Sequence, residues 1–343
     1  MLCAILRQFR FPYTDSPREV PDNVRYIIYG AGGIGCAIGG KLFQSGKDVV
    51  LIARGEHMER MRHHGLRLVT PSETLELPIP VAAHPSEVEW RDDDVVILTM
   101  KSQDTAPALQ DLRAAAGDVP VICGQNGVAN ERMAARVFTR VYGTVVVLPA
   151  TYLEPGVVNL SAEQASGMLD TGRYPRGSDA VVEELTRDLS ESDYAAQPDE
   201  NVMRLKYAKL LNNLANSVQA LCGADAAAGE LVRNVRSEAL ACYEAASIEF
   251  SPEDLGERAA IRMRAAEGAP RWGGSSWQSL KRGAGSIETD YLNGEISLLG
   301  ALHGVPTPYN RMLQHVAAEA VRERREPGSY TVEELTERAE ALR

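Results

Sequence analysis

A glycine-rich turn between a predicted strand and a predicted helix places the strongest constraint on the fold of this chain. The run VRYIIYGAGGIG, residues 24–35, starts with β-branched and aromatic residues and then breaks into Gly30, Gly32 and Gly35. With a helix predicted over 36–43, this G-x-G-x-x-G spacing is that of a dinucleotide-binding turn. Gly30 allows the tight turn, Gly32 lets backbone amides approach a pyrophosphate, and Gly35 lets the helix pack on the strand.

The turn also predicts which backbone groups hold the nucleotide. The helix N-terminus would face the phosphates with its unpaired N–H groups and the positive end of its dipole. A second strand, predicted over 48–53, strengthens this interpretation because it completes the strand–helix–strand unit. The alternative is that the glycines only serve a tight turn. We expect cofactor contacts from the whole turn, which comprises Gly30, Ala31, Gly32, Gly33, Ile34 and Gly35.

Arg54 follows the second strand, at the position that selects between the two nicotinamide dinucleotides. An acidic residue there accepts a hydrogen bond from the ribose 2′-hydroxyl of NAD, whereas a cation pairs with the 2′-phosphate of NADP. Arg54 therefore favours NADP. The alternative is an ordinary solvated loop arginine.

Size, charge and cysteine content exclude several classes of protein. The 343 residues, 44% of them hydrophobic, exceed what one core usually holds, so we expect two domains. A formal net charge of −11 argues against nucleic acid as a partner. The five scattered cysteines lack metal-ligand spacing, which predicts no metal site and reduced thiols in a cytoplasmic protein. No apolar run approaches the ~20 residues that span a bilayer, so we expect no membrane partner.

The pattern of strands and helices divides the chain into three parts. Residues 1–23 lack a sustained apolar core and are interpreted as an N-terminal extension. Strands and helices alternate over 24–198, which predicts a dinucleotide-binding α/β domain. Strand patterns end near Pro198, so we predict a helical domain over 199–343. Within the α/β part we expect a hairpin over 66–69 and 74–81, and further strands of the sheet over 94–100, 120–123, 143–148, 157–160 and 167–171.

Polar side chains follow two of these strands. Lys101 comes directly after the apolar run 94–100, and Asn126 follows the run 120–123. Ligands of open α/β sheets bind at the carboxyl ends of the strands, so both residues are candidates for the site. Asn126 precedes a glycine and could alternatively mark a simple turn.

The segment 200–222 is predicted to be one amphipathic helix with an unusual polar face. Its leucines gather on one side, whereas Lys206, Lys209, Asn213 and Asn216 lie on the other, with Ser217 at the margin. Lysines and amides without an acid suit a cleft that holds an anionic, oxygen-rich ligand. The asparagines also lower helix propensity, which calls for a reason. The alternative is an exposed polar stripe.

The order of these features resembles that of the ketopantoate reductases, over about residues 24–325. The shared features are the glycine turn, Arg54, Lys101, Asn126-Gly127, the K-x-x-x-N of Lys209 and Asn213, and Ser276 twelve residues before Glu288 in E-x-D-x-x-N-G. The resemblance implies a Rossmann-type domain followed by an all-helical C-terminal domain like that of 6-phosphogluconate dehydrogenase. It also implies NADPH as cofactor and reduction of ketopantoate or a related 2-oxo acid.

The resemblance assigns roles to individual residues. Lys209 and Glu288 would be catalytic, Lys209 as the general acid that protonates the ketone oxygen and Glu288 as a residue that holds the substrate. Arg54, Lys101 and Asn126 would serve the cofactor. The predicted substrate-binding residues are Asn213, Asn216, Ser217 and Ser276.

The chain departs from the family pattern on the substrate side. Ser217 stands where a second helix asparagine is usual, Gly273 replaces a polar residue, and Trp277 lies in a segment that is usually S-M-L-Q-D. The identity of the 2-oxo acid therefore stays open, as does the choice between monomer and homodimer. Two alternatives are an NADP-dependent dehydrogenase of another hydroxy or amino acid and a non-catalytic NADPH-binding protein.

Overall fold

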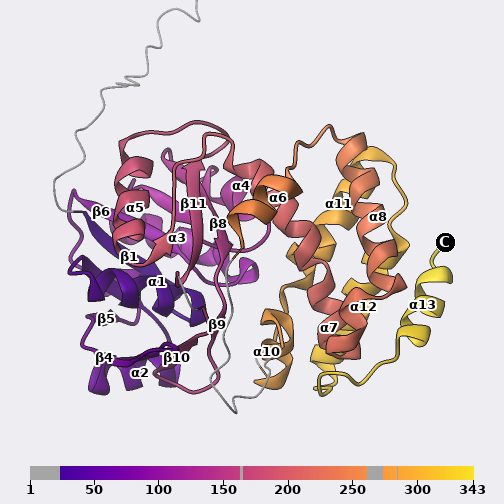
Figure 1. The fold of residues 1–343 in the computed structure, drawn as a ribbon, viewed down its shortest axis with the longest axis horizontal. Coiled ribbons are helices and arrows are strands. Elements are labelled where there is room, and N and C mark those ends of the chain that lie inside the picture. The colour runs from indigo at the N-terminus through magenta and orange to yellow at the C-terminus, as the bar shows by residue number, and fades with distance from the viewer. Residues whose placement is uncertain (1–23, 163–164, 261–272, 284) are drawn as a thin grey trace, which may run out of the picture.

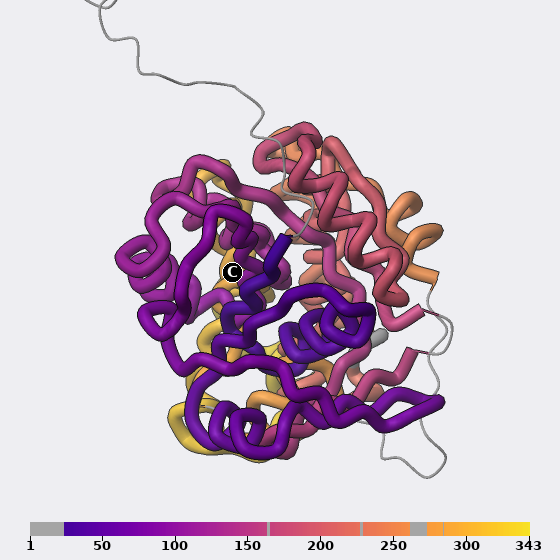
Figure 2. The backbone as a smooth tube through the Cα atoms, turned by 90° about the vertical axis from the view of Figure 1, so that its left-hand side faces the viewer, coloured from indigo at the N-terminus to yellow at the C-terminus, as the bar shows by residue number. Residues whose placement is uncertain are grey.

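The computed structural model describes residues 24–162, 165–260, 273–283 and 285–343, so the predicted extension 1–23 lies outside the described residues. Figure 1 shows two parts side by side, one of strands and helices and one of helices alone. Seen from the α/β side in Figure 2, the helical part lies behind it. The predicted fold class is confirmed.

An eight-stranded sheet forms the centre of the α/β domain, in the order β12-β11-β8-β7-β6-β1-β2-β5. Neighbouring strands are parallel except β8 and β11. The carboxyl ends of β1, β6 and β7 therefore lie at one edge of the sheet. This agrees with the prediction that Lys101 and Asn126, which follow β6 and β7, lie at a common edge. The strands are β1 (Arg25–Tyr29), β2 (Asp48–Ile52), β5 (Val81–Ala82), β6 (Asp94–Leu98), β7 (Val121–Cys123), β8 (Val141–Val147), β11 (Gly167–Arg173) and β12 (Tyr194–Ala195).

Side chains alternate along each strand, so both faces of this sheet carry apolar residues, and helices cover both faces. Tyr26 and Ile28 of β1 belong to the core beneath α1 and α5, whereas Ile27 belongs to the core beneath α3 and α4. The helices of this domain are α1 (Gly33–Gln44), α2 (Gly55–His64), α3 (Thr105–Ala116), α4 (Asn130–Ala134) and α5 (Ala180–Glu191).

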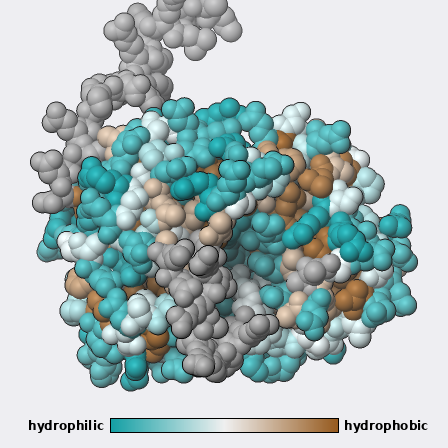
Figure 3. Space-filling model, in the orientation of Figure 1, coloured by the Kyte–Doolittle hydropathy of each residue, from teal (hydrophilic) through white to brown (hydrophobic). Residues whose placement is uncertain are grey.

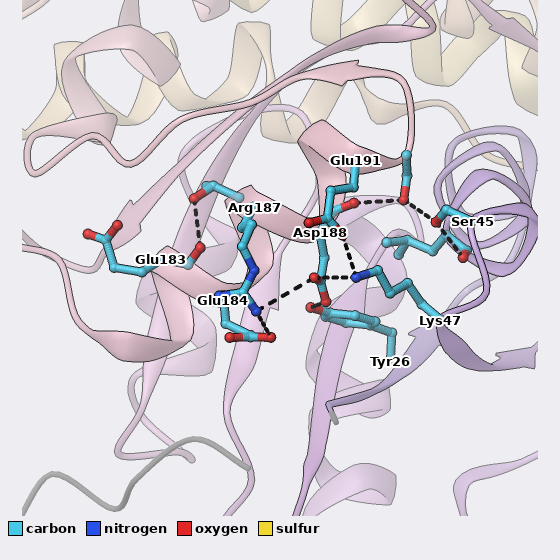
Figure 4. A network of polar contacts seen from close by, with 11 residues as sticks. Tyr26, Ser45, Lys47, Glu183, Glu184, Arg187, Asp188 and Glu191 are labelled. Atoms are coloured by element: carbon cyan, nitrogen blue, oxygen red, sulfur yellow. Dashed lines mark hydrogen bonds and ion pairs between the residues drawn. The ribbon is translucent and has the colours of Figure 1, made fainter. Parts of the chain in front are cut away.

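A buried carboxylate fixes α5 on the sheet. Asp188 accepts hydrogen bonds from the Tyr26 hydroxyl and from Lys47 Nζ, each at 2.7 Å (Figure 4). Lys47 Nζ also lies 2.8 Å from the Glu191 carboxylate. These contacts join α5 to β1 and to the start of β2, at the end of the sheet opposite the glycine turn.

A second sheet corrects one prediction about the strands. The expected hairpin is confirmed, because β3 (Leu66–Val69) and β4 (Thr74–Leu77) pair antiparallel. The run 157–160 was predicted to continue the main sheet, which is wrong. It forms β10 (Val157–Leu160), which pairs parallel with β3 and antiparallel with β9 (Ala150–Thr151), giving the order β4-β3-β10-β9. The hairpin offers β10 an open edge, a long-range pairing that local sequence patterns do not contain.

The helical domain packs around its own core of leucines, valines and tyrosines. An isolated parallel bridge joins Pro198 to Thr171 of the preceding sheet, and the first helix begins at Val202. The boundary at residue 198 stays a prediction. The helices are α6 (Val202–Asn213), α7 (Ala215–Cys222), α8 (Glu230–Ala245), α9 (Pro252–Arg258), α10 (Ser275–Lys281), α11 (Asn293–His303), α12 (Pro308–Arg322) and α13 (Val332–Glu340).

The predicted single helix over 200–222 is interrupted at Leu214, between α6 and α7. Arg236 Nε donates a hydrogen bond to the Leu211 carbonyl at 3.0 Å, and an uninterrupted helix would use that carbonyl for the amide of residue 215. Helices bend where a side chain enters their hydrogen-bond ladder. The run of asparagines around the break lowers the cost of this interruption.

Hydrophilic residues cover most of the face drawn in Figure 3, with hydrophobic ones in small patches. Among the helices of the described residues, none combines the length and the apolar character needed to cross a membrane.

Candidate active site

A cavity of about 1840 Å³ lies between the two domains. The α/β domain lines it with the turn from Gly30 to Ile34, with residues of the strand ends and with Arg54. The helical domain lines it with α6, α7, α10 and the segment before α11. The predicted site residues that border this cavity are Gly30, Ala31, Gly32, Gly33, Ile34, Arg54, Lys101, Asn126, Lys209, Asn216 and Glu288.

The glycine turn has the geometry of a phosphate cradle. Gly30 has a φ of +89°, and a Cβ added there would lie 2.5 Å from the Met100 backbone nitrogen, so only glycine fits. Helix α1 begins at Gly33, and Gly33 and Ile34 border the cavity, so the unpaired amides of its first turn lie at the cavity wall. Gly35 does not border the cavity and instead packs on Ile28 of β1. This turn fits the pyrophosphate of a dinucleotide.

Arg54 lies at the N-cap of α2, directly after β2. Its side chain is 79% exposed, and Nη2 lies 3.6 Å from Asp104 Oδ1. The guanidinium is therefore held loosely at the cavity edge, where a phosphate could replace the carboxylate as its partner.

Lys209 projects from α6 into the cavity toward the strand ends. Its Nζ donates a hydrogen bond to Asn126 Oδ1 at 2.5 Å. Burial, reinforced by the neighbouring Lys206 ammonium, lowers the pKa of Lys209 to about 7, while Glu288 acts in the opposite direction. An ammonium with this pKa can give up a proton near neutral pH.

Lys206, predicted to share the cavity face with Lys209, has a different position. Its Nζ lies 2.7 Å from Glu131 Oε1, and both side chains are almost fully buried. The same ammonium donates hydrogen bonds to the carbonyls of Gln125 and Thr144 at 2.9 and 3.1 Å. The polar face of α6 was predicted to lack an acidic partner, which is wrong for Lys206. Its partner is Glu131 of α4, in the other domain. Lys206 attaches the helix to the sheet one turn before Lys209.

Glu288 is buried at the start of a 3₁₀ helix, Glu288–Tyr291. Its Oε1 accepts hydrogen bonds from the Ser102 backbone amide at 3.0 Å and from Ser102 Oγ at 2.8 Å. Residues on either side of Ser102 also contact the helical domain, since Lys101 Nζ donates to Ser279 Oγ and Gln103 Nε2 donates to Ser286 Oγ. Three consecutive residues after β6 therefore join the two domains at the cavity.

The predicted substrate-binding residues are placed unequally. Asn216 borders the cavity, whereas Asn213, Ser217 and Ser276 are buried and are not among its lining residues. Ser217 Oγ contacts Thr289 Oγ1 at 2.9 Å and donates to Asn293 Oδ1 at 2.8 Å. Asn213 Nδ2 and Ser276 Oγ have no hydrogen-bond partner in the part of the chain that is described. Substrate contact by these four residues stays a prediction.

Several residues of the site had no signal in the sequence. His57 is buried beside Tyr152, with ring centroids 4.3 Å apart, and its Nδ1 accepts a hydrogen bond from the Gly156 amide at 2.8 Å. Burial lowers the pKa of His57 to about 4, so the ring is neutral. The positions of Glu131, beside Lys206, and of Arg282, at the cavity, were likewise not predicted from the sequence. Ser102 could have been inferred, because it follows a strand at its carboxyl end.

Comparison with known proteins agrees with this geometry. The family model "Ketopantoate reductase PanE/ApbA" matches residues 26–174, and its C-terminal counterpart matches residues 201–320. A 2-dehydropantoate 2-reductase of Halobacterium salinarum is 30% identical over 314 residues, covering 88% of this chain and all of that protein.

Two solved structures show the same two-domain arrangement. A PanE/ApbA family ketopantoate reductase from Ralstonia eutropha has a TM-score of 0.74 and 30% identity, covering 88% of this chain and 100% of that one. D-mandelate dehydrogenase with NADH and anilino(oxo)acetate has a TM-score of 0.76 and 26% identity, covering 88% and 99%.

A glycine turn and a lysine from a helical domain that face one cavity define a two-domain oxidoreductase with a nicotinamide dinucleotide cofactor. Within that class, the chain belongs to the ketopantoate reductase family.

Proposed function

We propose that this protein uses NADPH to reduce ketopantoate, or a related 2-oxo acid, to the 2-hydroxy acid. The observation that carries the proposal is the Lys209 ammonium, which shares one cavity with the glycine turn and has a pKa lowered to about 7. Its relatives named 2-dehydropantoate 2-reductase support the substrate class.

In such a reduction the residues of the cavity would have different roles. A bound reduced nicotinamide supplies the hydride that the carbonyl carbon accepts. Lys209 delivers a proton to the carbonyl oxygen as negative charge develops there. Asn126 holds the ammonium through its 2.5 Å hydrogen bond, and Glu288 provides a carboxylate for a substrate hydroxyl. Arg54 and Lys101 serve the cofactor.

Turnover with a panel of 2-oxo acids tests this proposal. Ketopantoate, 2-oxoisovalerate, pyruvate and phenylglyoxylate would each be mixed with the enzyme and NADPH or NADH, and nucleotide oxidation would be followed. We expect ketopantoate or a close analogue with NADPH to give the highest kcat/KM. Phenylglyoxylate is included because of the similarity to D-mandelate dehydrogenase. NADPH binding without turnover of any acid would favour the non-catalytic alternative.

Replacement of Arg54 tests the choice of NADPH. Arg54→Ala removes the cation that would pair with the 2′-phosphate, so the Kd of NADPH should rise about tenfold or more while that of NADH changes little. Calorimetric titration of both nucleotides measures this difference. Arg62→Ala is the matched control, because Arg62 lies on the same helix, pairs with Glu87 and does not border the cavity. Equal weakening of both nucleotides would contradict the assignment.

The pH dependence follows from the lowered pKa of Lys209. A proton donor must be protonated, so kcat/KM should be constant below pH 7 and fall about tenfold per pH unit above it. Because Glu288 raises the pKa of Lys209, Glu288→Gln should move the midpoint to lower pH. Initial rates between pH 5.5 and 9 measure both profiles. An identical midpoint in the variant would mean that another group titrates.

A further inference from the structure

Arg282 reaches from the helical domain to the α/β domain. It follows α10, which lies between the two domains (Figure 1), and it borders the cavity. Its Nη1 donates a hydrogen bond to the Tyr152 carbonyl at 2.8 Å, and its Cζ lies 4.8 Å from the centroid of the Tyr152 ring. The guanidinium is therefore held in one orientation by the opposite domain.

Tyr152 connects this arginine to the glycine turn. A Cβ added to Gly33, the first residue of α1, would lie 3.3 Å from Tyr152 Cβ. Gly33, Tyr152 and Arg282 all line the same cavity. Tyr152 thus lies beside the N-terminal end of α1 and in contact with the guanidinium, so the two positive features lie on the same side of the cavity.

Among the described residues, the charge of Arg282 has no acidic partner. No carboxylate of the described residues forms an ion pair with it, and its hydrogen bond to Tyr152 uses only Nη1. Nε and Nη2 have no hydrogen-bond partner in the part of the chain that is described. The other cavity cations are engaged, Arg54 with Asp104, Lys101 with Ser279 and Lys209 with Asn126. In a chain of net charge −11, an arginine held without an acid calls for an anionic ligand.

The proposed dinucleotide cofactor would supply the anionic group nearest to Arg282. The first-turn amides of α1 face the pyrophosphate of a dinucleotide, and Arg54 lies where the 2′-phosphate would bind. We propose that Arg282, which comes from the helical domain, binds the cofactor pyrophosphate together with the amides of α1. This inference rests on the proposed dinucleotide cofactor, and it makes cofactor binding depend on the position of α10 and thus on the approach of the two domains.

Binding measurements on Arg282→Met test the proposal without turnover. We expect the Kd of NADPH and of NADH to rise by the same factor, about tenfold, because both contain the pyrophosphate. The Kd of adenosine 2′-monophosphate, which lacks the pyrophosphate, should stay within about twofold of wild type. Arg282→Lys should recover part of the loss, since a point charge replaces the planar fork.

Lys281→Met is the matched control. Lys281 is the neighbouring residue, carries the same charge and pairs with Glu326 on the exposed surface. It should bind NADPH as the wild type does. An unchanged NADPH affinity in Arg282→Met would overturn the proposal, and so would an equal loss for adenosine 2′-monophosphate. An unchanged NADPH affinity with a raised KM for the 2-oxo acid would instead assign Arg282 to the substrate carboxylate. If no 2-oxo acid is reduced but the expected pattern of Kd values is found, the proposed reaction fails and this inference stands.

Discussion

Lys209→Ala should lower kcat for the best 2-oxo acid by at least ~10²-fold, because positioned proton donors contribute about 10²- to 10⁴-fold. The substitution removes the group whose Nζ lies 2.5 Å from Asn126 Oδ1 and whose pKa is lowered to about 7. Single-turnover NADPH oxidation with saturating substrate measures the chemical step directly. The Kd of NADPH should change little, since Arg54 and the glycine turn hold the nucleotide.

A matched variant separates proton donation from loss of packing. Lys209→Met keeps the length and the apolar stem of the side chain but has no proton to donate, so it should be as slow as Lys209→Ala. Lys209→Arg keeps a positive charge with a pKa too high for easy proton release, and it should also be slow. Turnover of Lys209→Met at the wild-type rate would refute the assigned role of Lys209.

Local patterns in the sequence predict the parts of the site that depend on backbone geometry. The turn of Gly30, Gly32 and Gly35 predicts a strand, a helix and the phosphate cradle together. A Cβ at Gly30 or Gly35 would clash with neighbouring atoms, whereas Gly32 is expected to leave space for the pyrophosphate. Lys101 and Asn126 were located by the rule that parallel strands end at a common edge, and both border the cavity. The two-domain fold is confirmed for the same reason, since strand and helix periodicities differ along the chain.

Local sequence patterns did not predict the contacts between segments that are far apart in the chain. The polar face of α6 was predicted to border a ligand cleft without an acidic partner, yet Lys209 faces the cavity while Lys206 pairs with Glu131, which comes 75 residues earlier in the chain. Helical periodicity places side chains on a face but does not say which element packs against that face. The role of Glu131 and the position of β10 both depend on such packing.

Lys206→Met should destabilise the protein by about 3–5 kcal/mol, because the substitution leaves Glu131 buried without its counter-charge. The carbonyls of Gln125 and Thr144 also lose their donor. The free energy of unfolding, obtained from urea denaturation, measures this effect. Arg176→Met provides the comparison, since Arg176 and Glu249 form an exposed ion pair and its loss should leave the denaturation midpoint unchanged.

The double variant Lys206→Met with Glu131→Gln distinguishes an unpaired charge from a packing defect. Removal of both charges should recover a large part of the lost stability, because the cost arises from the isolated carboxylate. The single variant Lys206→Met also has a consequence for the site. Lys206 lowers the pKa of Lys209 by like-charge repulsion, so its replacement should move the midpoint of the pH profile to higher pH. A stability loss without this shift would show that Lys206 only fastens α6 to the sheet, whereas both effects together would show that the buried ion pair also sets the acidity of Lys209.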